Sequence, residues 1–141
     1  MAEVIFENLV KENNLENKFY IDSAGTGSWH QGSKPHKGTR SVLKKNNLTG
    51  ESLQARQVED VDFEIFDIMV AMDTSNKKDL EVIKKGDKTN IILLRDFDDQ
   101  ADSLDVPDPY FKIIGGFERV YEIIDRSCRN LLVKLEKDIK I

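Results

Sequence analysis

Apolar residues follow the period of an α-helix at both ends of the chain. Near the N-terminus the pattern predicts an amphipathic helix with apolar positions at Ala2, Ile5, Phe6, Leu9 and Val10. Near the C-terminus the same spacing predicts a longer helix with apolar positions at Phe117, Val120, Tyr121, Ile124, Cys128, Leu131, Leu132 and Leu135. Each helix therefore has one face suited to packing against a core.

Three short segments between these helices have the composition of β-strands. Residues 18–23 (KFYIDS) combine aromatic and β-branched residues and predict a short strand. Residues 66–72 (FDIMVAM) and 90–94 (NIILL) are almost entirely apolar, which is typical of strands buried on both faces. The sequence therefore predicts three strands.

Two further helices are expected between the strands. Pro35 suits the first turn of one helix. Thr74 is expected to cap another, which reaches Lys85 and stops at Gly86. Strands that alternate with helices indicate an α/β fold of three layers, in which helices cover both faces of a parallel sheet. We expect residues 1–141 to form a single domain.

Composition narrows the class of protein and its partners. A hydrophobic content of 39% with 33% charged residues is that of a globular chain and not of a disordered one. The formal net charge of −5 argues against nucleic acid and anionic membranes as partners. No apolar run is long enough to span a bilayer, and the N-terminus lacks a signal-peptide pattern. The single cysteine, Cys128, fits a reducing compartment, so we expect a cytoplasmic protein.

An aspartate between two prolines is the first candidate for chemistry. Asp108 lies in the segment DVPDPYF, where Pro107 and Pro109 restrict the backbone around it. It belongs to a stretch of about twenty residues without periodicity, from Arg95 to Gly115, and loops of that length in compact domains are usually functional or disordered. Ligands of open α/β sheets bind beyond the carboxyl ends of the strands, where this loop begins. A proline-rich surface turn is the alternative.

Two more loops follow predicted strands. The segment GTGSWHQG holds Trp29, the only tryptophan, which either lines a pocket or packs over the sheet edge. The segment AMDTSN holds Asp73, which we interpret as a structural residue that caps or braces its loop.

The remaining reactive side chains are interpreted as structural. His30 and His36 have no thiol nearby in the sequence, so no metal site is expected. Cys128 lies on the apolar stripe of the last helix, where cysteine behaves as a small hydrophobic residue. A cysteine phosphatase signature requires arginine six positions later, and that position is Lys134.

Several segments together resemble the low-molecular-weight protein tyrosine phosphatases. They are MAEVIF at the start, IDSAGTGSW (21–29), ARQ (55–57), DFEIFDIMVAMDTSN (62–76) and VPDPYF (106–111). They occur in the family's order and cover essentially the whole chain. The resemblance implies that Asp108 is the general acid and that Trp29, Tyr110 and Phe111 line the slot for the substrate's aromatic ring. Within the matching segments we expect Ser23, Asp73 and Asn76 to support the loops.

The resemblance implies hydrolysis of a phosphotyrosine protein or a small aryl phosphate through a cysteinyl-phosphate intermediate. Asp108 would protonate the leaving phenolate and then activate water. No cofactor or metal is expected, because the family's phosphate loop supplies backbone N–H groups and an arginine.

One part of the family pattern is not found among the 141 residues. In the family, the first strand of a four-stranded sheet and a Cys-x5-Arg-Ser-Pro loop come directly before a segment like MAE. The first helix also begins at residue 2 without a capping residue. We therefore expect an N-terminally truncated domain that lacks its nucleophile, and we expect the exposed sheet to favour self-association.

Three alternatives to a tyrosine phosphatase remain open. Protein arginine phosphatases share the fold but typically lack the pocket tryptophan, so Trp29 favours an aryl phosphate. Arsenate reductases would need redox cysteines besides Cys128. The chain is otherwise a non-catalytic remnant that binds a partner or dimerises.

Overall fold

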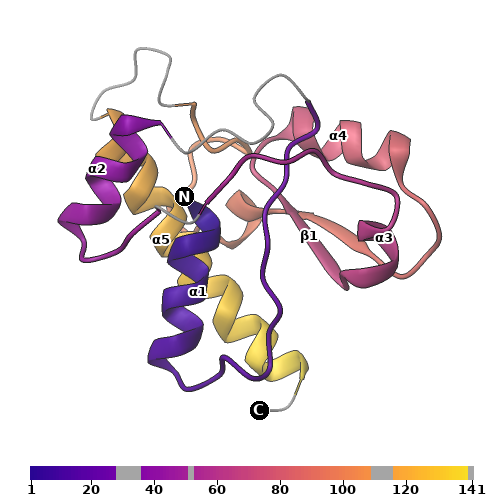
Figure 1. Cartoon of the computed structure of the whole chain (residues 1–141), viewed down its shortest axis with the longest axis horizontal. Coiled ribbons are helices and arrows are strands. Elements are labelled where there is room, and N and C mark those ends of the chain that lie inside the picture. The colour runs from indigo at the N-terminus through magenta and orange to yellow at the C-terminus, as the bar shows by residue number, and fades with distance from the viewer. Residues whose placement is uncertain (28–35, 51–52, 109–115, 140–141) are drawn as a thin grey trace.

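The computed structural model describes residues 1–27, 36–50, 53–108 and 116–139. Its elements in chain order are α1 (Ala2–Glu12), α2 (Lys37–Lys45), α3 (Asp62–Ile65), β1 (Ile68–Ala71), α4 (Thr74–Ile83), β2 (Asn90–Leu93), the 3-10 helix η1 (Leu94–Phe97) and α5 (Gly116–Asp138) (Figure 1). The two long amphipathic helices and the second and third strands are confirmed, with ends trimmed by a few residues.

The sheet pairs β1 with β2 in parallel, with Ile68 opposite Asn90 and Ala71 opposite Leu93. Alternate side chains of both strands enter two different cores, as expected for strands buried on both faces. Met69, Ala71, Ile91 and Leu93 pack with Phe63 of α3 and Leu80 of α4, and Val70, Met72, Ile92 and Leu94 pack toward α1 and α5.

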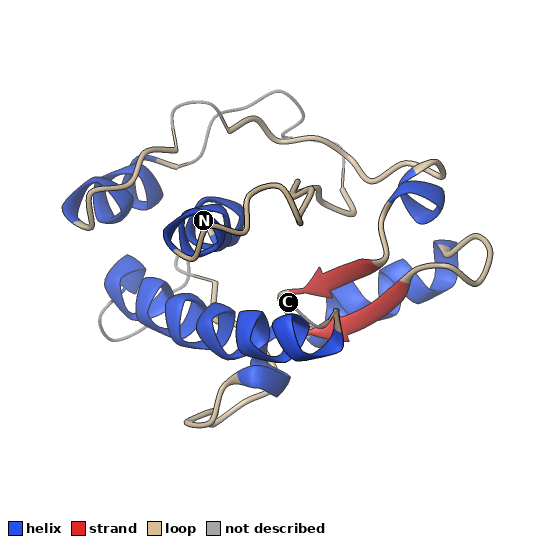
Figure 2. Ribbon diagram, turned by 90° about the horizontal axis from the view of Figure 1, so that it is seen from below, coloured by secondary structure: helices blue, strands red, loops and turns tan. Residues whose placement is uncertain are grey.

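Helices therefore cover both faces of the parallel sheet, which confirms the α/β prediction. On one face α1 packs beside α5, and η1 also contacts α5 (Figure 2). On the other face α4 contacts both strands. The large core beneath α1 and α5 includes the buried Ile5, Leu9 and Cys128. This arrangement places the carboxyl ends of both strands at the same edge of the molecule.

The strand predicted at residues 18–23 is wrong. This segment forms no ladder, and the chain first pairs two residues later, through an isolated bridge between Gly25 and Gln57. A strand requires a partner, and among the described residues none lies alongside this segment. Neighbouring side chains of this segment nevertheless point in opposite directions, as they would in a strand. Phe19 packs against the core, whereas Tyr20 is 72% exposed and stacks on Phe66.

β1 has one edge without a paired strand in the described part of the chain, because the sheet order is β1-β2 alone. An open edge presents unpaired backbone N–H and C=O groups. Self-association through this edge stays a prediction.

The helix ends differ from the sequence predictions in two places. α4 begins at Thr74, but its cap is Asp73, so the prediction that Thr74 caps the helix is wrong. The helix ends at Ile83, short of Lys85, and Gly86 follows in the left-handed region with φ +71°. α2 is capped by His36, whose Nδ1 accepts a hydrogen bond from the Gly38 N–H, and Pro35 lies outside the described residues.

Candidate active site

The candidate site is built on the turn that joins β1 to α4. Asp73 is the N-cap of α4, and its Oδ1 accepts a hydrogen bond of 2.6 Å from the backbone N–H of Asn76. A carboxylate suits this position because it pairs with an otherwise unsatisfied N–H group and with the positive end of the helix dipole. The cap therefore fixes the direction in which the chain leaves the carboxyl end of β1.

The loop that carries Asp108 crosses this turn and is hydrogen-bonded to it. The Val106 N–H donates to the Met72 carbonyl at 2.8 Å, directly beyond the end of β1. The Thr74 N–H donates to Asp105 Oδ1 at 2.8 Å, at the first turn of α4. Val106 is itself buried in the core. Residues 105 and 106 are thus held by their backbone, a side chain and core packing together.

Asp108 follows two residues after this anchored point and its side chain is exposed. Pro107 fixes its own φ, so little backbone freedom separates Val106 from Asp108. The structure therefore places Asp108 at the carboxyl-end edge of the sheet, in solvent-accessible surroundings.

Ser23 is bonded to the first helix. Its Oγ donates a hydrogen bond of 2.6 Å to Glu3 Oε1 in the first turn of α1. Three residues further on, Thr26 Oγ1 lies 3.4 Å from Asp79 Oδ2 of α4. These contacts join the chain after residue 23 to both helices. Asn76 takes part through its backbone N–H in the cap of α4.

The aromatic residues predicted to line the substrate slot lie outside the described residues. They are Trp29, Tyr110 and Phe111. Their convergence with Asp108 stays a prediction.

Sequence reasoning missed a clamp formed by Arg56, which belongs to the segment ARQ. Its guanidinium donates to both carboxylate oxygens of the buried Asp62 at 2.9 and 3.1 Å, and to Asp22 at 3.1 Å. Burial alone would raise the pKa of Asp62, but the hydrogen bonds from Arg56 and from the Glu59 N–H outweigh it and lower that pKa. The clamp joins the segment before Ser23 to α3. The sequence shows no periodic pattern that would indicate this clamp.

A second missed cluster lies under the loop that carries Asp108. The carboxylate of Asp98 is fully buried and accepts from Arg126 of α5 at 2.6 and 3.0 Å and from the Gln100 N–H at 2.9 Å. The hydrogen bonds from Arg126 hold the pKa of Asp98 below its usual value. Arg95 of η1 completes the cluster, with Nε 3.1 Å from Asp98 Oδ2. The only sequence signal for it is a run of aspartates after Arg95.

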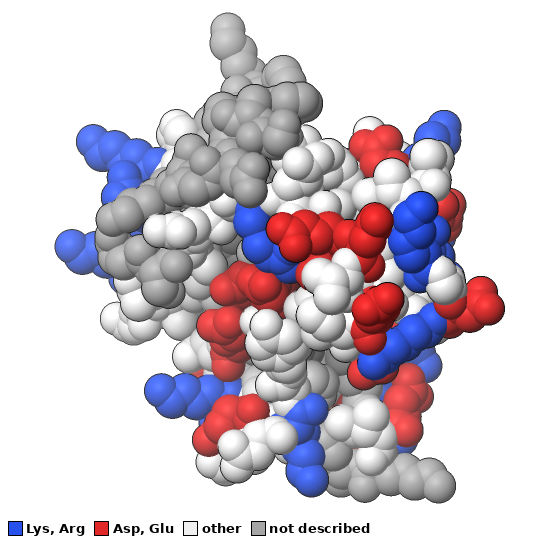
Figure 3. All heavy atoms as spheres, turned by 45° about the vertical axis from the view of Figure 1, so that its right-hand side comes forward, with Lys and Arg blue, Asp and Glu red and all other residues white. Residues whose placement is uncertain are grey.

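Three further features of the described residues concern membranes, metal ions and surface charge. No helix among them is long and apolar enough to cross a membrane. They also contain no group of three or more His, Cys, Asp or Glu side chains arranged to bind a metal ion. The face drawn in Figure 3 carries acidic and basic side chains together.

Cys128 is expected to be unreactive in the folded protein. The thiol is buried on α5, and burial raises its pKa from 9.0 to about 12. Its thiolate fraction at pH 8 is therefore very small. We expect alkylation by iodoacetamide at pH 8 to be complete in denaturant and negligible without it over the same time, as measured by mass spectrometry. Equal labelling under both conditions would contradict the burial of Cys128.

Comparison with known proteins identifies the family to which the chain is similar. The family model of the low molecular weight phosphotyrosine protein phosphatases matches residues 1–141. The low molecular weight protein-tyrosine-phosphatase YfkJ of Bacillus subtilis is 39% identical over 139 residues, which are 98% of this chain and 88% of that protein. PtpA of Staphylococcus aureus, described in the same words, is 36% identical over 141 residues, 100% of this chain and 88% of its own length.

Solved structures show the same fold. A protein tyrosine phosphatase from Entamoeba histolytica superposes with a TM-score of 0.89 at 33% identity, covering 97% of this chain and 88% of the other. The Drosophila arginine phosphatase DARP superposes with a TM-score of 0.87 at 33% identity, covering 96% and 88%. With the match over its whole length and relatives above 30% identity, the chain belongs to the low molecular weight phosphotyrosine protein phosphatase family.

Proposed function

We propose that this chain forms the scaffold and general-acid loop of a protein tyrosine phosphatase, with Asp108 as the acid. Membership of the family supports the reaction class. The observation that carries the assignment of Asp108 is the anchored backbone before it, where the Val106 N–H donates to the Met72 carbonyl at the end of β1. An acid held at this edge is directed toward the place where ligands of parallel α/β sheets bind.

The reaction proceeds in two steps. A cysteine thiolate attacks phosphorus, an S–P bond forms, and the bond from phosphorus to the aryl oxygen breaks while Asp108 gives its proton to the departing phenolate. Water then attacks phosphorus, Asp108 takes a proton from it, and the S–P bond breaks to release inorganic phosphate and the thiolate. Asp108 thus ends the cycle protonated, as it began.

The nucleophile of this reaction is not Cys128. That thiol is buried, its pKa is about 12, and the residue six positions later is Lys134 instead of arginine. The 141 residues contain no other cysteine. We propose that a Cys-x5-Arg-Ser-Pro loop outside these residues supplies the thiolate and the arginine, and that the 141 residues alone do not hydrolyse phosphate esters.

The substrate is a phosphotyrosine protein or a small aryl phosphate. Trp29, Tyr110 and Phe111 together would offer aromatic walls to a flat phenyl ring, for which stacked and edge contacts are favourable. The proposal includes no metal and no cofactor, because backbone N–H groups and an arginine of the phosphate loop suffice for a dianion. A cytoplasmic location stays a prediction.

Phosphoarginine is the second candidate substrate. The likeness to the Drosophila arginine phosphatase, with a TM-score of 0.87 at 33% identity, favours it. Protein arginine phosphatases of this fold typically lack the pocket tryptophan, so Trp29 favours phosphotyrosine.

The test compares two proteins. One is the 141-residue chain. The other, called here the extended protein, carries a strand and a Cys-x5-Arg-Ser-Pro loop from a family relative joined before Met1. We expect the 141-residue chain to hydrolyse p-nitrophenyl phosphate no faster than buffer. The extended protein should hydrolyse it, and should act on a phosphotyrosine peptide faster than on the matching phosphoarginine peptide.

Each other outcome has a definite meaning. Full activity of the 141-residue chain would overturn the two-step mechanism. Faster hydrolysis of the phosphoarginine peptide would make the protein an arginine phosphatase. A folded extended protein without activity on either peptide would favour a non-catalytic binding role.

A further inference from the structure

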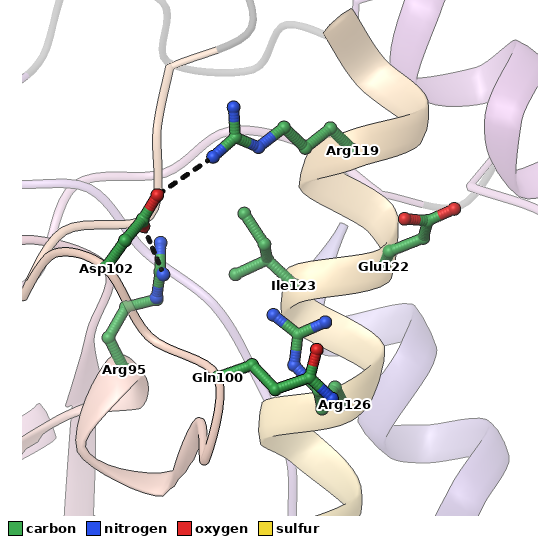
Figure 4. Close-up of a pocket in the computed structure, with 7 residues that line it drawn as sticks. All are labelled: Arg95, Gln100, Asp102, Arg119, Glu122, Ile123 and Arg126. Atoms are coloured by element: carbon green, nitrogen blue, oxygen red, sulfur yellow. Dashed lines mark hydrogen bonds and ion pairs between the residues drawn. The ribbon is translucent and has the colours of Figure 1, made fainter. Parts of the chain in front are cut away.

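A buried arginine lies beneath the loop that carries Asp108. Arg95 belongs to η1, directly after β2, and its side chain is 2% exposed. It lines a small cleft of about 120 Å³ between this loop and α5, together with Asp102, Arg119 and Arg126 (Figure 4). Long cationic side chains are rarely buried unless they are paired, so the partners of Arg95 indicate what it does.

The guanidinium of Arg95 contacts three points of the loop. Nη1 donates to the backbone carbonyl of Asp105 at 2.9 Å, and Nη2 donates to Asp102 Oδ1 at 2.9 Å. Nε lies 3.1 Å from Asp98 Oδ2, close enough for an ion pair, although its N–H is not directed at that oxygen. The planar fork of arginine is suited to holding several acceptors in fixed directions.

Asp105 is the residue through which these contacts reach the candidate acid. Arg95 holds its carbonyl oxygen, while the Thr74 N–H holds its carboxylate at 2.8 Å. The next residue, Val106, is bonded to Met72 and buried. The loop is thus held from the side of β2 by Arg95 and from the side of β1 by Thr74 and Met72.

The link from Asp105 to Asp108 is short and stiff. Only Val106 and Pro107 lie between them, and Val106 is fixed by its hydrogen bond and its burial. Pro107 cannot vary its φ, and Pro109 restricts Asp108 from the other side. Arg95 therefore acts, together with the anchors of Val106, on the short segment that sets the position of Asp108.

We propose that Arg95 is a positioning residue for the general acid: it fixes the Asp105 carbonyl and so sets the place of the Asp108 carboxyl group. The inference rests on the proposed function, because it gives Arg95 a role only if Asp108 acts as the acid. Arg95 itself does not touch the substrate.

Arg119 offers a matched control. It shares the partner Asp102 with Arg95, at 3.2 Å, but makes no bond to Asp105 and is 42% exposed. Figure 4 shows the carboxylate of Asp102 between the two guanidinium groups. Arg119→Gln therefore removes a similar charge from the same cleft and leaves the anchor of Asp105 in place.

The anchor is tested in the 141-residue chain by amide hydrogen exchange. In Arg95→Gln, the N–H groups of Val106 and Thr74 should exchange about 10-fold faster or more, as expected for the loss of a hydrogen bond from a charged group. The exchange rates of amides in the middle of α5 should not change in Arg95→Gln. In Arg119→Gln, the exchange rates of Val106, Thr74 and the α5 amides should all equal those of the wild type. Unchanged exchange at Val106 and Thr74 in Arg95→Gln would overturn the proposal.

Arg95→Lys covers the case in which Arg95→Gln does not fold. It keeps a positive charge beside Asp98 but loses the fork that reaches Asp105 and Asp102 together. The same selective increase at Val106 and Thr74 is expected. Unfolding of this variant as well would make Arg95 a residue of general stability and would overturn the positioning role.

The effect on the acid is tested in the extended protein with phenyl phosphate. Arg95→Gln should lower kcat roughly 100-fold with little change in KM, since a misplaced catalytic group costs about that much. It should have no further effect in a protein that already carries Asp108→Asn, because the two changes act through one group. An equal slowing by Arg95→Gln in both backgrounds, or none in either, would overturn the proposal.

The two experiments separate this inference from the proposed function. If Asp108→Asn alone does not slow the extended protein, the assignment of the acid fails, and the exchange data still decide whether Arg95 anchors the loop. If Asp108→Asn slows it and Arg95→Gln does not, only the positioning role fails.

Discussion

Replacing Asp108 with asparagine in the extended protein should lower kcat for phenyl phosphate by roughly 100-fold or more, the usual contribution of a general acid. Asparagine is similar in size but has no proton to give at neutral pH, so phenolate must leave unprotonated. KM should change little, because binding of the phosphate group falls to the loop that carries the arginine.

Asp99→Asn provides the control for this prediction. Asp99 is an exposed aspartate in the same loop, so the substitution changes the net charge equally without altering the proposed acid. It should leave kcat within about twofold of the parent, as is usual for surface substitutions. If Asp108→Asn has no larger effect than Asp99→Asn, Asp108 is not the acid.

Replacing Asp98 with asparagine should destabilise the 141-residue chain by about 3–5 kcal/mol, the usual cost of removing one partner of a buried ion pair. The carboxylate of Asp98 is fully buried between Arg126 and Arg95. Without its charge, the side chain of Arg95, which is 2% exposed, faces a neutral amide in a site with little water. The free energy of unfolding is measured by urea denaturation at pH 7.

The loss of folding stability in Asp98→Asn should depend on pH, and this dependence follows from the pKa of Asp98. That pKa is lower in the folded protein than its usual value of 3.8, mainly because Arg126 donates to the carboxylate. Its stabilising contribution is therefore complete well above pH 3.8 and is lost as the pH falls through the lower, folded value. The difference between wild type and Asp98→Asn should shrink in that acidic range. A difference below about 0.5 kcal/mol at pH 7, the size of an ordinary surface substitution, would contradict the account of the cluster.

The parts of the fold that could be predicted from the sequence are those set by local periodicity. The apolar stripes of α1 and α5 extend over several turns, and both helices form where the stripes predict them. β1 and β2 are apolar on both faces, and both faces are covered by helices. In these elements the pattern of burial is repeated often enough to be recognised without knowing the partner.

The failures concern structure that depends on distant parts of the chain. Residues 18–23 have the composition of a strand, but a ladder needs a neighbouring strand, and composition carries no information about it. The short helix α3 has too few residues to show a period. Asp73, rather than Thr74, caps α4, and a shift of one residue at a helix end lies within the usual uncertainty of boundaries.

The charged clusters around the site also depend on residues that are far apart in the sequence. Asp98 and Arg126 are 28 residues apart, and Arg56 bonds to Asp22, 34 residues before it. Charged residues are usually exposed, so nothing in the sequence marks these as buried pairs. The candidate acid is marked in the sequence by two local features, which are the prolines on either side of Asp108 and the family motif.

The most direct test of the central claim is the rate of phenol release in the first turnover of the extended protein, measured for aryl phosphates whose phenols differ in pKa. If Asp108 protonates the leaving oxygen as the P–O bond breaks, the rate should depend weakly on the pKa of the phenol. In Asp108→Asn the dependence should become steep, with poor leaving groups slowed far more than good ones. The same dependence in both proteins would contradict the assignment of Asp108 as the general acid.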